Sequence, residues 1–378
     1  MRFILIATRI SANNHMSKKQ RRKPTQKAQT RYLCEAEVAP GLEFITAEEI
    51  QKRVSGLIGQ PQYQKGKGFV HFRYQGELKA LCALKTVIAI YVILKFDVPR
   101  PKALLGHQHF TKITQMIHSV RSMWPAGTFK TLSIGAAGKH TKVMQRLQQA
   151  LGEGSHLEVV ERGDLHLRIR PAKDMGWETL IRISPRPLAT RDYRIHNMEG
   201  ALNASVAHAM CLLANSQAND IFVNIACGSG TLLIERAMIG ELWQAIGIDN
   251  RLEALQMAQV NIEASGYGQK IELIWGDAHQ IPLADNSADV LVADLPFGQL
   301  VGDMTSNETL YPAVLKEGGR IAKDGAQFII ITHAIKLMEK VLREQGMWVV
   351  ERILPITLSG LHPRIFLLKR KSRTIDEV

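Results

Sequence analysis

Cysteine is scarce in this sequence, and its few cysteines are not spaced as metal ligands. The four cysteines include no CxxC pair, so they predict neither a zinc site nor a disulfide framework. The thirteen histidines form no ligand cluster either. A long apolar run is also lacking, since no stretch approaches the length that spans a membrane. We therefore expect a cytoplasmic protein with reduced thiols, no metal and no membrane segment.

Acidic residues are scarce in the first half of the chain. Residues 1–190 carry 31 lysines and arginines against 13 aspartates and glutamates, a net charge of +18, whereas residues 191–378 carry 17 against 22, a net charge of −5. Positive charge confined to one half favours a module that binds a polyanion, joined to a second module of another kind. The solvated surface of a basic protein is the alternative, but the change of charge coincides with a change of pattern, which favours nucleic acid.

The chain is too long for a single core, because 378 residues exceed the size at which one hydrophobic core usually stops growing. Residues 1–30 precede the first regular pattern. Their apolar run is too short for the core of a signal peptide, and the basic stretch behind it predicts a disordered arm. Met16, followed by Ser-Lys-Lys, is a more natural start of translation than Met1.

Short strands and helices alternate over residues 31–187 and divide into two predicted α+β units. The first covers residues 31–98 and ends at a stretch with two prolines. It comprises strands at 32–40 and 66–74, a helix at 41–54, and a helix running into a strand over 76–96. The second, residues 99–187, comprises helices at 110–123 and 140–154, a strand at 128–137 and a hairpin at 165–187.

Residues 188–378 have a different pattern. Near-continuous apolar strands such as "IFVNIA", "DVLVA" and "QFIIIT" alternate with helices, which is typical of a parallel sheet buried on both faces in a doubly wound α/β domain. Two late strands joined by the short link "TLSGLHP" predict a terminal hairpin that adds an antiparallel strand to this Rossmann-like sheet.

Polar residues follow four successive strands of that domain, where ligands bind in open α/β sheets. Asn224 and the glycine-containing stretch 227–231 follow the first strand, and glycines there let a ligand approach the backbone. Asp249 follows the second strand and can bind a ribose diol. Asp277 and Asp294 follow the third and fourth strands. Each residue could instead form a turn or cap a helix. All of them lie at the same edge of the predicted sheet, however, which favours the binding of a single ligand.

The glycine pattern does not fit a dinucleotide site, because Leu233 stands where GxGxxG requires its third glycine. Together, "CGSGT", "GIDN", "GDA" and "DLPFG" resemble the successive motifs of class I S-adenosylmethionine-dependent methyltransferases. The fourth resembles the motif of enzymes that methylate exocyclic amines of bases. The resemblance covers about residues 191–370 and implies S-adenosylmethionine as the cofactor. It implies binding roles for Asn224, Cys227, Gly228, Gly230, Thr231, Asp249, Asn250, Asp277, Ala278 and Asp294.

The first half resembles a ferredoxin-like domain (residues 31–98) joined to a THUMP RNA-binding domain (residues 99–187), followed by the methyltransferase domain (residues 188–378). With the linker "TRDYRIHNMEGALNASVAHAM", this arrangement is similar to the THUMP-containing guanosine methyltransferases. The family binds structured RNA, chiefly transfer RNA, and methylates the guanosine N2 amine. We expect RNA contacts from five basic residues, namely Lys130, Lys139, Lys142, Arg191 and Arg194. Cations beside a helix start at 140 suit phosphate, although an ordinary exposed helix start gives the same local pattern.

The expected chemistry explains the stretch that ends the fourth strand. A guanine amine is a poor nucleophile, so alignment and two hydrogen-bond acceptors are the main requirements. Asp294 and the carbonyl of Leu295 would supply the acceptors. Pro296 would make the turn rigid, and Phe297 would stack on the splayed-out base.

Two departures from the family pattern bear on this prediction. Asn224 replaces an acid that would face the cofactor ammonium group, which predicts weaker cofactor binding. Leu295 replaces a proline of the general motif, as in the guanosine branch. A methyltransferase acting on ribosomal RNA or on another exocyclic amine is one alternative. An RNA-binding protein whose methyltransferase-like domain has lost activity is the other.

Overall fold

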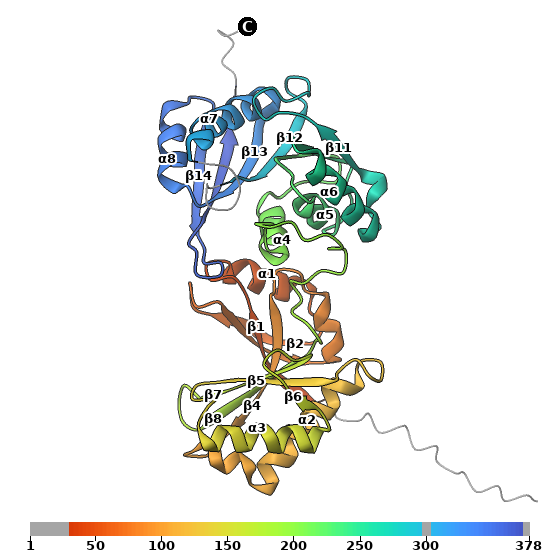
Figure 1. Cartoon of the computed structure of the whole chain (residues 1–378). Coiled ribbons are helices and arrows are strands. Elements are labelled where there is room, and N and C mark those ends of the chain that lie inside the picture. The colour runs from red at the N-terminus through yellow and green to blue at the C-terminus, as the bar shows by residue number, and fades with distance from the viewer. Residues whose placement is uncertain (1–29, 297–303, 373–378) are drawn as a thin grey trace, which may run out of the picture.

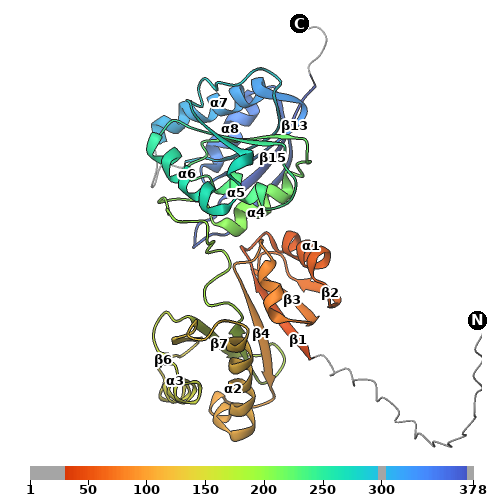
Figure 2. The same cartoon turned by 90° about the vertical axis from the view of Figure 1, so that its right-hand side faces the viewer.

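The computed structural model describes residues 30–296 and 304–372, and these form two lobes stacked end to end (Figures 1 and 2). The basic arm predicted over residues 1–30 falls almost entirely outside this range, as does Phe297. None of the helices within the described ranges is both long and apolar enough to cross a membrane.

The N-terminal lobe is built on one eight-stranded sheet with the order β2-β3-β1-β4-β8-β7-β5-β6. Its strands are β1 (Arg31–Glu37), β2 (Leu57–Tyr63), β3 (Phe69–Gln75), β4 (Ala89–Phe96), β5 (Thr131–Ala136), β6 (Glu158–Val159), β7 (Leu165–Pro171) and β8 (Trp177–Arg182). Its helices are α1 (Glu43–Arg53), α2 (His107–Ser122) and α3 (Lys142–Ser155), with short 3₁₀ turns η1 (Leu78–Ala83) and η2 (Pro101–Leu105).

The sheet runs across the boundary predicted at residue 98. Strand β4 from the first predicted unit pairs antiparallel with β8 from the second, and one core cluster contains side chains of α1, α2 and α3 together. The helix expected before β4 is only the 3₁₀ turn η1. The edge strand β2 was not predicted from the sequence. It contains Pro61 and is largely exposed, so its residues do not alternate between apolar and polar.

The second lobe has the predicted doubly wound sheet, in the order β11-β10-β9-β12-β13-β15-β14. Its strands are β9 (Ile221–Ile225), β10 (Gln244–Asp249), β11 (Ile271–Trp275), β12 (Ala288–Asp294), β13 (Ala322–Thr332), β14 (Trp348–Pro355) and β15 (Arg364–Arg370). Its helices are α4 (Ala204–Leu213), α5 (Thr231–Ala237), α6 (Leu252–Ser265), α7 (Met304–Ile321) and α8 (Ile335–Glu344), with the 3₁₀ turn η3 (Gly268–Lys270).

Strands β9 to β13 run parallel, and β15 is inserted antiparallel between β13 and β14, which confirms the predicted terminal hairpin. Helices α4, α5 and α6 share a core cluster on one face of the sheet, and α7 and α8 share another on the opposite face. The apolar strand runs follow from this double coverage, since both faces of the central strands are buried.

The two lobes meet where α1 lies against α4 and the β14–β15 connection (Figure 1). Leu42 and Ile45 of the N-terminal lobe belong to the same buried cluster as Leu354 and Ile356 of the second lobe. The Thr357 amide donates to the carbonyl of Pro40 at 3.0 Å. The lobes therefore share a packed apolar junction in addition to the covalent linker.

Candidate active site

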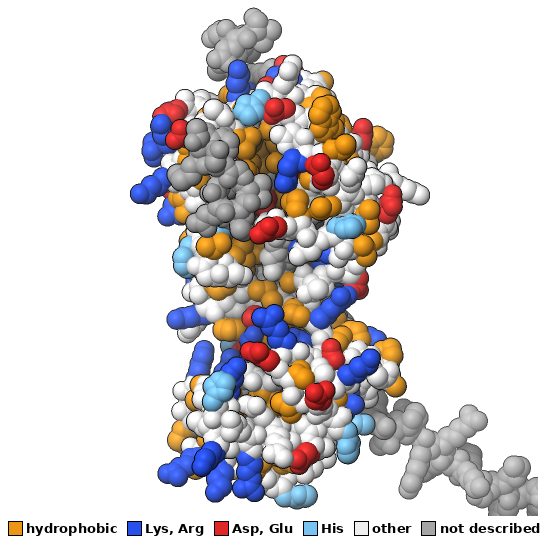
Figure 3. All heavy atoms as spheres, in the orientation of Figure 1, with side chains coloured by type: hydrophobic (Ala, Val, Ile, Leu, Met, Phe, Trp, Pro, Cys, Tyr) orange, Lys and Arg blue, Asp and Glu red, His pale blue; other side chains and the backbone are white. Residues whose placement is uncertain are grey.

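The carboxyl ends of β9, β10 and β12 and the turn after β11 surround a cavity of about 470 Å³. A hollow is visible in the upper lobe of Figure 3. The lining residues include nine of the ten residues predicted to bind a cofactor directly, namely Asn224, Cys227, Gly228, Thr231, Asp249, Asn250, Asp277, Ala278 and Asp294. Gly230 is the tenth, and it lies within the same loop.

Backbone conformation shapes the loop after β9. Gly228 has φ +53° and Gly230 has φ +80°, a left-handed region that favours glycine. A Cβ atom at Gly228 would lie 2.8 Å from Cε of Met198, and one at Gly230 would lie 3.3 Å from Cβ of Ala258. The loop is also tied to β10, because the Cys227 amide donates to the Ile248 carbonyl at 2.9 Å. Its glycines therefore serve both the turn and close packing.

Asn224 is buried at the end of β9 with an unused acceptor. Its Nδ2 donates to the carbonyls of Ile225 at 3.2 Å and Val292 at 3.3 Å. Its Oδ1 is buried without a hydrogen-bond partner among the described residues. A buried acceptor of this kind is costly unless a ligand donates to it. Asn224 thus fits a cationic or N–H donor at this end of the cavity.

Asp249 is buried at the end of β10 and organises the loop. Its Oδ2 accepts from the Gly228 amide at 2.8 Å, and its Oδ1 accepts from the Arg251 amide at 3.0 Å. The capping alternative raised from the sequence does not hold, because Arg251 is the N-cap residue of α6 and this helix start has no side-chain cap hydrogen bond. Asp249 also lines the cavity. Its carboxylate therefore contacts the loop after β9 and the residue before α6, and it also faces the space for a ligand.

Asp277 lies in an exposed turn after β11. Its Oδ1 accepts from the His279 amide at 2.9 Å and contacts His279 Nδ1 at 2.8 Å. These hydrogen bonds hold the pKa of Asp277 below its usual value. The carboxylate is therefore charged at neutral pH and, with Ala278, borders the cavity.

Asp294 ends β12 and faces the cavity together with Leu295 and Pro296. Burial raises the pKa of Asp294 to about 7, so the group sits near the balance between acid and carboxylate at neutral pH. Leu295 continues the sheet, since its amide donates to the Ile331 carbonyl at 3.1 Å. The predicted position of Phe297 lies outside the described residues.

Two stretches that line the cavity were not predicted as site residues. Residues 198–202 precede α4, and Asn307, Thr309 and Leu310 belong to α7. Asn307 is buried, and its Oδ1 has no hydrogen-bond partner within the described part of the chain. The sequence could have pointed to the α7 residues only because they closely follow the loop after β12 in the chain. No group of three His, Cys, Asp or Glu side chains that could hold a metal ion occurs in the described ranges.

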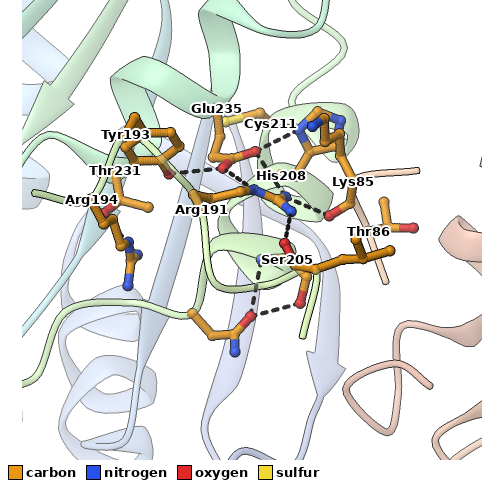
Figure 4. Close-up of polar contacts among 12 residues, drawn as sticks. Lys85, Thr86, Arg191, Tyr193, Arg194, Ser205, His208, Cys211, Thr231 and Glu235 are labelled. Carbon is orange, nitrogen blue, oxygen red and sulfur yellow. Dashed lines mark hydrogen bonds and ion pairs between the residues drawn. The ribbon is translucent and has the colours of Figure 1, made fainter. Parts of the chain in front are cut away.

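The prediction that Arg191 contacts RNA is wrong, because this side chain is buried at the junction of the lobes (Figure 4). Its Nε donates to Glu235 Oε1 at 2.8 Å, and its Nη2 donates to the Lys85 carbonyl at 2.7 Å. Tyr193 and His208 contact the same carboxylate at 2.8 and 2.9 Å. Burial alone would raise the pKa of Glu235, but hydrogen bonds from His208 and Arg191 hold it below its usual value.

Arg194 also contacts the protein interior. Its Nη2 donates to the Leu202 carbonyl and to Thr231 Oγ1, the latter at 3.0 Å, and its Nε is buried. Arg194 is half-buried, and these contacts hold its Nη2 against the loop walls of the cavity, so its contact with RNA stays a prediction.

The three predicted RNA-binding lysines are exposed but do not lie together. Lys139 lies in the turn that leads from β5 into α3 and Lys142 is the first residue of α3, whereas Lys130 precedes the opposite end of β5. The six residues of β5 separate these ends by roughly 20 Å, given about 3.3 Å per strand residue. The lysines therefore lie at two separate places on the lobe, and their contact with RNA stays a prediction.

Comparison with known proteins identifies the second lobe. Residues 191–363 match the model of the RMKL-like methyltransferase domain. A mouse protein named tRNA (guanine(6)-N(2))-methyltransferase THUMP3 is 29% identical over 185 residues, which are 46% of this chain and 37% of the relative. The chain thus spans just over a third of the length of that curated relative.

Similarity over nearly the full length is also found. The tRNA (guanine(6)-N2)-methyltransferase of Methanocaldococcus jannaschii is 24% identical over 391 residues, covering 88% of this chain and 98% of the relative. The crystal structure of TrmN from Thermus thermophilus has a TM-score of 0.70 at 19% identity and covers 90% of this chain and 99% of that one. The second lobe therefore has the class I methyltransferase fold.

Proposed function

We propose that this protein transfers the methyl group of S-adenosylmethionine to the N2 amine of a guanosine in transfer RNA. The observation that carries the proposal is the meeting of Asp294, Leu295 and Pro296 with Asn224 and the 227–231 loop at one cavity. The relatives named as tRNA guanine-N2-methyltransferases support the substrate. A similar structure described as a putative methyltransferase complexed with SAH (TM-score 0.64, 17% identity) supports the cofactor.

The cavity residues fit S-adenosylmethionine chemically. The unpartnered Oδ1 of Asn224 can accept from an ammonium group. Asp249, which faces the same space, can accept from ribose hydroxyls, and the charged Asp277 can accept from an adenine amine. The cofactor, when bound, supplies an electrophilic methyl group on a sulfonium.

The chain's own contribution is the alignment of the guanine amine. The carboxylate of Asp294 and the carbonyl of Leu295 would accept its two hydrogens and direct the nitrogen lone pair toward the methyl group. The same two acceptors would stabilise the positive charge that develops on that nitrogen. With a pKa of about 7, Asp294 can then hold the released proton.

The N-terminal lobe supplies the RNA affinity in this proposal. Without the first 30 residues, the half ending at residue 190 still carries 23 basic against 13 acidic residues, a net charge of +10. Such an excess binds phosphate and guides RNA toward the cavity. Lys139 and Lys142 are exposed beside the α3 start and remain our candidates, with Lys130 as a separate site.

Mass spectrometry of nucleosides from the transfer RNA of a strain lacking the gene tests the function, since N2-methylguanosine should be absent and should be restored by the gene. An unchanged nucleoside pattern would refute it.

A second RNA class is also a candidate substrate, because a bovine U6 snRNA (guanine-N(2))-methyltransferase is 33% identical over 138 residues. Absence of the nucleoside from another RNA would select that candidate. If isothermal titration detects no binding of S-adenosylmethionine, the protein is instead an inactive RNA-binding protein.

A further inference from the structure

A chain of hydrogen bonds ends on the turn that follows Asp294. The hydroxyl of Tyr311, on α7, lies 2.7 Å from the Pro296 carbonyl and 2.5 Å from Thr332 Oγ1. Thr332 ends β13 and accepts from the Ala334 amide at 3.0 Å. Tyr311 and Thr332 are both fully buried. Three elements, α7, β13 and the start of α8, are thereby connected to one backbone carbonyl beside the cavity.

The direction of these hydrogen bonds follows from the chemistry of the groups. A carbonyl only accepts, so the single phenolic hydrogen of Tyr311 is donated to Pro296. Tyr311 must then accept from Thr332, whose own oxygen accepts from Ala334. Burial raises the pKa of Tyr311 to about 12, so the phenol keeps the proton that it donates. Every hydroxyl in the chain of bonds is satisfied in this one arrangement.

The turn is consequently held on both sides of the Leu295 carbonyl. On one side the Leu295 amide donates to Ile331 at 3.1 Å. On the other, the proline ring restricts rotation and the next carbonyl is anchored by Tyr311. Resting on the proposed function, we infer that Tyr311 and Thr332 are positioning residues that orient the Leu295 carbonyl and Asp294 toward the guanine amine.

A purely structural role for the same residues makes a different prediction. Tyr311 belongs to the core cluster between α7, α8 and the sheet, so its ring packs whether or not its hydroxyl has a partner. If the hydroxyl only contributed stability, its removal would lower the melting temperature and leave the turnover of the folded enzyme unchanged. If it orients the turn, removal should lower kcat, because a small misplacement of reacting groups can reduce the rate about 100-fold.

The test uses the full chain with transfer RNA and compares Tyr311→Phe, Thr332→Val and Thr332→Ser. We expect kcat of Tyr311→Phe to fall about 10- to 100-fold, with little change in the dissociation constant for S-adenosylmethionine. Thr332→Val should lose activity in the same way, and Thr332→Ser, which keeps the hydroxyl, should retain it. The double variant Tyr311→Phe/Thr332→Val should be no slower than the slower of the two single variants, since both act through one chain of bonds.

The outcomes separate this inference from the proposed function. Parental kcat in Tyr311→Phe, or equal losses of activity in Thr332→Val and Thr332→Ser, would overturn the positioning role in an enzyme that is otherwise active. A parent that methylates no guanosine would overturn the proposed function and this inference with it. Should Tyr311→Phe fail to fold, the comparison of valine with serine at position 332 decides the matter.

Discussion

Asp294 lies where a buried strand opens onto the cavity, and this position controls its charge. Desolvation disfavours the carboxylate, which raises its pKa to about 7. Because the proposed role needs an acceptor, kcat/KM should rise as the pH increases through about 7 and then level off. Below that pH the protonated acid loses an acceptor site. A pH–rate profile measures this, and a rate that increases toward acid would contradict the role.

Asp294→Asn removes the charge and retains the shape of the side chain. We expect kcat to fall by about 100-fold or more, the range typical of removing acid–base or electrostatic assistance, and the pH dependence near 7 to disappear. The cofactor dissociation constant should stay nearly unchanged. Single-turnover kinetics and isothermal titration check both points, and parental turnover in the variant would remove Asp294 from the mechanism.

Asn224→Asp tests the departure from the family pattern. Asn224 donates to two backbone carbonyls, and an aspartate would place a buried negative charge beside those same oxygens. The free variant should therefore unfold more easily, by about 1–3 kcal/mol. Cofactor binding should tighten on the order of 1 kcal/mol if the side chain faces an ammonium group. Thermal melts with and without cofactor measure both effects, and looser binding would show that Asn224 faces another group.

At the scale of elements, β5 separates two candidate RNA-binding sites. Lys139 and Lys142 lie where β5 leads into α3, and Lys130 lies at the other end. The double variant Lys139→Ala/Lys142→Ala should flatten the dependence of log affinity on log salt, by about 0.9 for each phosphate that the variant no longer neutralises. Filter binding of transfer RNA to the full chain over a range of salt measures the slope.

Lys130→Ala is the comparison for that experiment, because it removes one exposed cation just before the opposite end of β5. An unchanged slope for Lys130→Ala, beside a flattened slope for the double variant, would assign the RNA path to the α3 side. Slopes equal to the parent in every variant would show that none of the three lysines contacts RNA and that their charge serves solubility alone.

At the scale of the whole molecule, Arg191 joins the lobes. Its guanidinium binds Glu235 of α5 and the Lys85 carbonyl of the N-terminal lobe at once. A lysine cannot reproduce this forked geometry, so Arg191→Lys should lower the free energy of unfolding by about 2 kcal/mol. It should also increase tryptic cleavage in the linker between residues 183 and 203. Chemical denaturation and mass spectrometry of the fragments measure these changes.

Arg186→Lys provides the control, since Arg186 pairs with Asp192 on the surface of the same linker, where both side chains are more than half exposed. Exposed pairs contribute about 0–1 kcal/mol, so this variant should match the parent. If both variants behaved alike, the burial of Arg191 would not be what holds the lobes together.

Local sequence patterns determined much of the second lobe. The apolar runs predict its parallel strands because both faces of each strand are buried, and the polar residues after those strands meet at one cavity because parallel strands end at one edge. The predicted cofactor residues line that cavity or lie in its loop for this reason. The unequal charge of the two halves is likewise a property of composition alone.

Only the tertiary structure decided which residues are partners over long distances. The single eight-stranded sheet of the N-terminal lobe depends on the pairing of β4 with β8, and the burial of Arg191 depends on Glu235, 44 residues away. The same holds for Tyr311 and Pro296, 15 residues apart on different elements. Periodicity reports which side of an element is apolar, but it carries no information on which distant group fills a hydrogen bond, and so a buried arginine and an RNA-binding arginine look the same in sequence.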